Sequence, residues 1–134
     1  MAKPSTANRP LSPHVSIWRW HATMASSIAH RMSGVVNYIG AVLVTVWLAA
    51  LAAGPEAYRA VEALMAGPVG ILVTLALIGF TLSLVYHMLN GIRHLAWDMG
   101  YGFDPKGSNL RSILIFAGAA VITAAIWVLA GGLI

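Results

Sequence analysis

The residues best suited to chemistry lie in one stretch, His87-Met88-Leu89-Asn90-Gly91-Ile92-Arg93-His94-Leu95-Ala96-Trp97-Asp98, at the end of a long apolar segment. A helix advances about 100° per residue, so steps of four and seven residues return close to the same face. This spacing places His87, Gly91, His94 and Asp98 in one stripe. An ionisable side chain inside a membrane span is costly and indicates a functional site. A neutral imidazole beside a glycine that admits a flat group is suited to ligating haem iron.

A second group of polar residues lies in Ser26-Ser27-Ile28-Ala29-His30-Arg31-Met32-Ser33-Gly34. Ser27, His30 and Arg31 are expected at one depth near the start of a helix. Such donors could bond a quinone carbonyl or hold a haem propionate at the membrane edge. The alternative for Arg31 is a side chain whose stem lies in the apolar layer while its guanidinium reaches water.

His87 is expected deeper in the membrane than His30 and His94. His87 precedes Asp98 by eleven residues, which puts it roughly 16 Å deeper in the membrane. His94 is expected near the level of His30. Two ligands on opposite faces of one iron must share one depth, so a second axial histidine is expected from another subunit. Other readings remain for three residues: a hydrogen bond to a neighbouring helix for His87, contact with water or headgroups for His94, and helix packing for Gly91.

The composition requires a membrane protein. Only 9% of the 134 residues are charged and 59% are hydrophobic, against roughly 25% charged residues in soluble domains. Uncharged runs of 24, 30 and 23 residues cover 32–55, 63–92 and 112–134. Each run exceeds the roughly 20 residues that a helix needs to cross the hydrocarbon. The sequence predicts an all-α membrane protein with three transmembrane helices, at about 26–53, 68–98 and 110–133.

The basic residues indicate topology rather than nucleic-acid binding. Seven of the eight lie before or at the start of the first span, or around the connection between the second and third spans; only Arg59 lies in the first connection. The positive-inside rule makes the richer side cytoplasmic. We expect a multi-pass protein of the bacterial inner membrane with a cytoplasmic N-terminus and a periplasmic C-terminus. The chain has no cysteine, which excludes thiolate-bound haem and iron–sulfur ligation by this chain.

The segments between the spans are rich in residues that end helices. Residues 1–22 are expected to form a polar cytoplasmic arm, because prolines within 10–13 disfavour a helix. Residues 23–134 are expected to form the three-helix anchor domain. The connection 54–67 is compatible with a short surface helix, and 100–107 is expected to turn. Ser108 or Asn109 is expected to cap the third helix.

These motifs resemble those of a known family, the cytochrome b556 subunits that anchor succinate dehydrogenase (complex II) in the membrane. The resemblance covers nearly the whole chain. It includes an N-terminal arm, Arg9-Pro10-Leu11-Ser12-Pro13-His14, and the first-helix motif at 27–34. It also includes the second-helix pattern H-x-x-x-G-x-R-H-x-x-x-D at 87–98. The resemblance implies a three-helix subunit that pairs with a second membrane anchor in a shared helix bundle and holds the flavoprotein and iron–sulfur subunits.

The resemblance also implies roles for single residues. His87 matches the axial ligand of haem b, with the second histidine supplied by the partner anchor. The residues matching the neighbours of the haem are His30, Arg31, Gly91 and His94. The residues matching the ubiquinone site are Ser27, Ile28 and Arg31. The chain would then be a subunit without catalytic residues of its own, which shapes the quinone site beside the shared haem.

Two other functions are compatible with three apolar spans. A haem-free anchor would only dock soluble redox subunits, which leaves the intramembrane His87 unexplained. A small transport subunit would use histidine and arginine for ion passage and would carry polar residues across the full membrane depth. The outer halves of the three spans are almost wholly apolar, with Thr45, Thr74 and Thr123 as the main exceptions.

Overall fold

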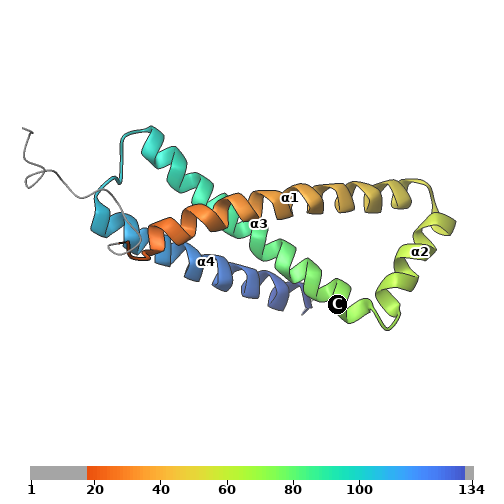
Figure 1. Ribbon diagram of the computed structural model, residues 1–134. Helices are drawn as coiled ribbons and strands as arrows, with labels where there is room; N and C mark the ends of the chain where they lie inside the picture. Colours follow the sequence, from red (N-terminus) through yellow and green to blue (C-terminus); the bar gives the residue numbers. More distant parts are fainter. Residues whose placement is uncertain (1–17, 132–134) are drawn as a thin grey trace, which may run out of the picture.

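The computed structural model describes residues 18–131, which form four helices (Figure 1). They are α1 (Ala22–Ala52), α2 (Pro55–Ala66), α3 (Gly70–Asp98) and α4 (Pro105–Gly131). Three of them, α1, α3 and α4, have 31, 29 and 27 residues and are apolar enough to cross a membrane. The predicted all-α architecture with three candidate spans is confirmed. The expected arm before residue 18 and the end of the third span after residue 131 lie outside the described residues.

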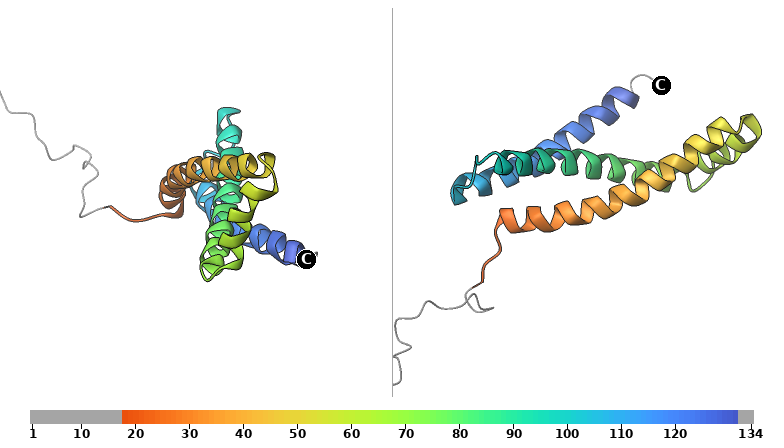
Figure 2. Two further views of the ribbon diagram at one scale, coloured as in Figure 1. Left: turned by 90° about the vertical axis from the view of Figure 1, so that its right-hand side faces the viewer. Right: turned by 90° about the horizontal axis from the view of Figure 1, so that it is seen from above.

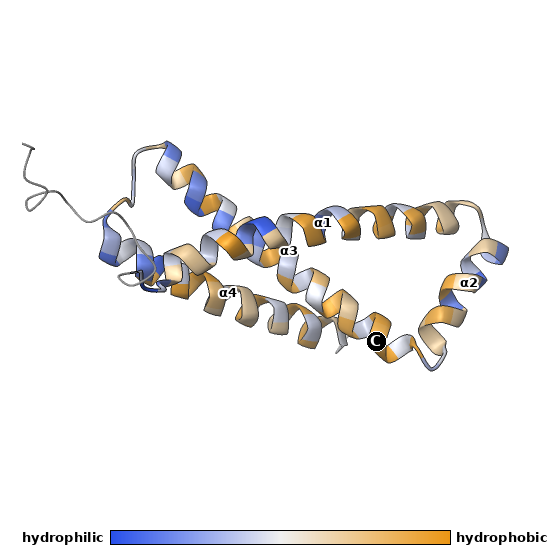
Figure 3. Cartoon of the chain, viewed as in Figure 1, coloured by the Kyte–Doolittle hydropathy of each residue, from blue (hydrophilic) through white to orange (hydrophobic). Residues whose placement is uncertain are grey.

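The long helices pack against one another, and α2 joins α1 to α3 at one end of the molecule (Figures 1 and 2). The start of α1, the end of α3 and the start of α4 meet at the other end. Hydrophilic residues gather at that end and on α2, whereas the middle of the bundle is largely hydrophobic (Figure 3). This distribution matches helices whose central parts face hydrocarbon and whose ends reach polar layers.

Few apolar side chains are buried within the bundle. Among the described residues only Val85, Tyr86 and Ala119 form a buried apolar cluster, and many large apolar side chains face outward. The most deeply buried side chains are polar: Asn90, Ser26 and Ser112. Helices in lipid gain little from burying apolar surface, so small residues and hydrogen bonds make their contacts.

A regular set of contacts sets the register of α1 against the antiparallel α3. Gly40 faces the ring of Phe80 so closely that a Cβ at this position would overlap the ring. Three residues closer to the polar end on both helices, Ser83 donates to Asn37 Oδ1 at 2.7 Å. Four residues beyond that, Ser33 lies 3.0 Å from His87 Nδ1. Steps of three and four residues follow one helical face, so the close contact at Gly40 also places His87 opposite Ser33.

Helix α4 begins at Pro105, five residues before the expected start of the third span at 110. Asp104 caps it, because its Oδ2 accepts the Gly107 amide at 2.7 Å, and proline is well suited to the first helical position. The expected cap at Ser108 or Asn109 is wrong, since both lie inside the helix. Asn109 instead accepts the amide of Ala22 at 2.9 Å, at the first turn of α1.

The other boundaries lie near the expected ones. Helix α1 begins four residues before the expected position 26 and ends at Ala52. Helix α3 starts at Gly70 rather than 68 and ends at Asp98. The connection between them contains α2, which follows Gly54 with a φ of 104°. A left-handed backbone of this kind favours glycine, and Pro55 then opens α2.

Candidate functional site

Three histidines from two helices lie together near the polar end of the bundle. The His30 ring on α1 stacks on the His87 ring of α3, with centroids 4.0 Å apart and planes 10° apart. The third histidine is His94 of α3, whose ring centroid lies 5.0 Å from that of His30. His30 is expected from the sequence near the level of His94, but the expected difference in depth between His30 and His87 is wrong, because their rings stack. The structure brings His30 close to both histidines of α3, so the two predicted motifs form one cluster.

His87 is the most constrained member of this cluster. Its Nδ1 lies 3.0 Å from Ser33 Oγ, and its Cε1 would lie 3.3 Å from a Cβ added at Gly34. Its ring is therefore bounded by Ser33, Gly34 and the His30 ring. Gly91, one turn away on α3, has open space where a Cβ would project. The site thus holds one oriented imidazole beside a position that carries no side chain.

The stacked pair cannot provide both axial ligands of one iron. Such ligands point their nitrogens at each other across the metal, whereas His30 and His87 lie face to face with nearly parallel planes. Within residues 18–131, no group of three histidine, cysteine, aspartate or glutamate residues is arranged to hold a metal ion. His30 and His87 are therefore not arranged to hold one metal ion between their two rings.

The residues predicted for a quinone site lie on α1 beside this cluster. Arg31 and Ile28 are exposed, and Ser27 is half-buried. These three residues do not share the contact of His30, whose ring stacks on that of His87 in α3. His30 and the predicted quinone residues therefore face different sides of α1: His30 contacts α3, whereas Arg31 and Ile28 lie on the outer surface of this chain.

A buried hydrogen-bond network that was not predicted from the sequence lies next to the histidine cluster, between α1 and α3. Ser26 Oγ lies 3.0 Å from Tyr86 Oη and donates to Asn90 Oδ1 at 3.0 Å. The Tyr86 hydroxyl also donates to the Ser26 carbonyl at 2.8 Å. Ser26 and Ser33 are seven residues apart, and this spacing was the available signal that both face α3. The network joins α1 to α3 immediately beside the histidines.

Arg93 does not extend to the surface, as an ordinary interfacial charge would. It is 5% exposed, donates to Ser112 on α4, and its guanidinium carbon lies 4.5 Å from the ring centroid of Trp97. Among the described residues, the guanidinium thus contacts the Ser112 hydroxyl and the Trp97 ring. Its Nε and Nη2 atoms have no hydrogen-bond partner among these residues. Arg93 therefore links α3 to α4 through the Ser112 hydroxyl.

The turn that follows α3 is held by Arg111. This side chain donates to Asp104 Oδ1 at 2.9 Å and to the Gly102 carbonyl, which also accepts from Trp97 Nε1 at 3.1 Å. The hydrogen bond from Arg111, followed by that from the Gly107 amide, lowers the pKa of Asp104 from its ordinary value. Asp104 therefore keeps its charge, as the cap of α4, to a lower pH than an ordinary aspartate would.

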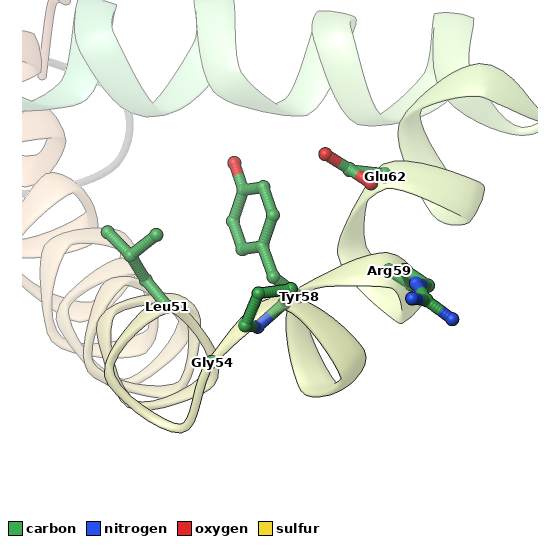
Figure 4. A pocket seen from close by; sticks show the side chains of 6 residues that line it. Leu51, Gly54, Tyr58, Arg59 and Glu62 are labelled. Carbon is green, nitrogen blue, oxygen red and sulfur yellow. The ribbon is translucent and has the colours of Figure 1, made fainter.

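Two surface hollows lie in different parts of the molecule. One lies at α2, at the end opposite the start of α1, and is lined by residues that include Leu51, Tyr58 and Glu62 (Figure 4). It contains no residue of the predicted site. The other is a mainly apolar groove beside the histidine cluster, lined by residues that include Ser33, Tyr86 and Phe116.

Three long apolar helices with histidines and arginines gathered near one end define a multi-pass membrane protein with a polar site built between its spans. The family described as "Succinate dehydrogenase/Fumarate reductase transmembrane subunit" matches residues 5–126. The chain belongs to this family of transmembrane cytochrome b subunits.

Curated relatives carry the corresponding names. The succinate dehydrogenase cytochrome b556 subunit of Paracoccus denitrificans is 34% identical over 122 residues, covering 91% of this chain and 92% of the relative. That of Rickettsia prowazekii (strain Madrid E) is 33% identical over 120 residues, covering 90% and 91%. The mitochondrial succinate dehydrogenase cytochrome b560 subunit of Sus scrofa is 42% identical over 97 residues, covering 72% of this chain and 56% of the relative. The resemblance found in the motifs is thereby confirmed.

Proposed function

We propose that this chain is a membrane anchor subunit of a succinate:quinone oxidoreductase, in which His87 is one axial ligand of a b-type haem. The second axial histidine comes from a partner membrane subunit. A flavoprotein and an iron–sulfur subunit dock at the polar end, which faces the cytoplasm of a bacterial cell. The observation that carries this proposal is the oriented His87 imidazole, held between two membrane-spanning helices of a cytochrome b family member.

The residues around His87 fit a haem. The missing side chain of Gly34 lets the His87 ring lie against α1, and Gly91 has open space where a Cβ would project. Neutral histidine is a common axial ligand of haem iron. His30, His94 and Arg31 lie towards the polar end of the bundle, where propionates would meet donors. When bound, haem b takes up and releases single electrons. The chain's own residues hold the ligand and surround the group.

Ser27, Ile28 and Arg31 would contribute to the ubiquinone reduction site. A quinone carbonyl gains negative charge as electrons arrive. The Ser27 hydroxyl and the Arg31 guanidinium can stabilise that charge as donors in a medium of low dielectric, while Ile28 offers apolar contact to the ring. Arg31 and Ile28 are exposed on this chain, as residues that line a site shared with other subunits would be.

The hydrogen bonds of threonine hydroxyls in the apolar halves of the spans, away from the histidines, disfavour a transport function. Thr45, Thr74 and Thr81 each donate to the carbonyl four residues earlier in their own helix, whereas the Thr123 hydroxyl has no hydrogen-bond partner among the described residues. A hydroxyl that donates its proton to its own helix has no proton left to donate to a neighbouring helix. The polar contacts between α1 and α3 are confined to the half of the bundle that contains the histidines.

Purification of the tagged chain from its native membrane in mild detergent tests the proposal. We expect a flavoprotein, an iron–sulfur protein and a second small membrane protein to co-purify, together with succinate-dependent quinone reduction. A reduced-minus-oxidised spectrum should show a b-type haem. Purification of the chain without succinate-oxidising subunits would contradict the anchor function, and an active complex without haem would support the haem-free anchor.

Space beside the His87 ring is expected to be essential for this site. A Gly34→Val substitution puts a Cβ 3.3 Å from His87 Cε1 and adds methyl groups beyond it, so the ring must move. We expect the ratio of haem to flavin in the purified complex to fall severalfold. The matched control is Gly79→Val on α3, where an added Cβ meets nothing within 4 Å. A normal haem ratio in Gly34→Val would show that the ring is not confined there.

A further inference from the structure

Ser33 makes two hydrogen bonds that together determine which His87 nitrogen carries the proton. Its Oγ donates to the His30 carbonyl at 2.8 Å and lies 3.0 Å from His87 Nδ1. A serine hydroxyl has a single proton, and a carbonyl oxygen only accepts. Both bonds are satisfied when Ser33 donates to the carbonyl and His87 donates its Nδ1–H to Ser33 Oγ.

This arrangement leaves Nε2 as the unprotonated nitrogen of a neutral His87. A neutral imidazole carries one proton, so a protonated Nδ1 means a lone pair on Nε2. Metal-bound histidines commonly donate their other ring N–H to an acceptor, which orients the ring and raises its basicity. Ser33 Oγ is an acceptor of this kind.

Ser33 is itself held in place. It is 7% exposed, and its backbone carbonyl lies 3.2 Å from the hydroxyl of Ser83, which also bonds Asn37. The close approach of α1 and α3 at Gly40 sets this register. The acceptor that faces His87 is therefore part of the packed interface between the two helices.

We propose that Ser33 is a positioning residue, which fixes His87 in the Nδ1–H tautomer so that Nε2 ligates the haem iron. This inference rests on the proposed role of His87 as the haem ligand. The hydrogen bond from Nδ1–H increases electron density on the imidazole, which favours the oxidised iron. Ser33 thereby lowers the midpoint potential of the haem.

The test is a spectroelectrochemical titration of the haem in the purified complex, together with the electron paramagnetic resonance spectrum of the oxidised haem. In Ser33→Ala the midpoint potential should rise, so that the ratio of oxidised to reduced haem at a fixed ambient potential falls by about two- to tenfold, the range for one neutral hydrogen bond. The low-spin resonance should also shift or broaden, because the ring orientation is less restricted. Ser33→Cys, whose sulfur is a weaker acceptor, should give a smaller change in the same direction.

Two further variants separate this role from general packing. Ser33→Thr keeps the hydroxyl, which can still bond a carbonyl in the preceding turn, and should restore the wild-type potential. Ser83→Ala removes a hydroxyl from the same interface that bonds the Ser33 carbonyl and Asn37 rather than the His87 ring, and should shift the potential less than Ser33→Ala does.

The outcomes distinguish the positioning role from the ligand role. A wild-type potential in both Ser33→Ala and Ser33→Cys would overturn the inference, as would an equal shift in Ser83→Ala. If Ser33→Ala fails to assemble, the potential of Ser33→Cys decides. Retention of the haem signal in His87→Leu would instead contradict the proposed function, whatever the Ser33 variants show.

Discussion

Replacing His87 with leucine is expected to abolish the b-type haem absorbance of the purified complex. Leucine has a similar bulk and no lone pair, so it cannot ligate iron. The neighbouring His30 ring lies face to face with His87 at 4.0 Å, so it is not oriented to replace the lost ligand on the same axis. Ser33 would also lose its contact with Nδ1. The measurement is a reduced-minus-oxidised spectrum normalised to flavin.

The control for this substitution is His21→Leu. His21 precedes α1 and is exposed, and its Nδ1 lies 3.4 Å from the Arg19 carbonyl. It should retain the full haem signal. An undiminished signal in His87→Leu would show that another residue ligates the iron. Loss of the signal in both variants would mean that histidine replacement at this end disturbs assembly rather than ligation.

Replacing Arg31 with leucine is expected to reduce quinone reduction by about 100-fold, the scale for losing one donor that stabilises a developing negative charge. Succinate oxidation with an artificial dye should remain near the wild-type rate, because that reaction bypasses the quinone site. Arg31 is exposed on α1 beside the exposed Ile28, so its removal leaves no buried partner without a bond in this chain. The measurement compares the two rates on the same preparation.

Two variants calibrate the Arg31 result. Arg59→Leu removes an exposed arginine from α2, at the opposite end of the molecule, and should change neither rate. Arg31→Lys keeps the charge but loses the planar fork of donors, so an intermediate rate is expected. Equal loss of both activities in Arg31→Leu would indicate failed assembly and would exclude a specific role at the quinone.

The spans were predictable because burying charge in hydrocarbon is so costly that uncharged runs mark them. The start of α4 was not. Asp104, Ser108 and Asn109 can all cap a helix, and the choice depends on Pro105 at the first position and on Arg111, which bonds Asp104. Asn109 has a partner at Ala22, 87 residues away in the chain. Local sequence patterns do not reveal such a pairing.

The two histidine motifs were predictable separately, but not as one cluster. Helical periodicity orders His87 and His94 along their own helix, yet it says nothing about how far α1 is shifted along α3. The contact of Gly40 with Phe80 sets that shift and brings His30 between the two. Ser33 lies within the first-helix motif, but its contact with His87 depends on that register and is visible only in the structure.

The bond between Asn109 and the Ala22 amide has a consequence for biogenesis. The first helix leaves the ribosome well before the last one, so the opening turn of α1 lacks its cap while the earlier spans enter the membrane. Ser112, which receives the Arg93 guanidinium, also arrives with the final span. The end of the bundle that carries the histidines is therefore completed last. A ligand or partner that needs this end complete could bind there only after the whole chain is inserted.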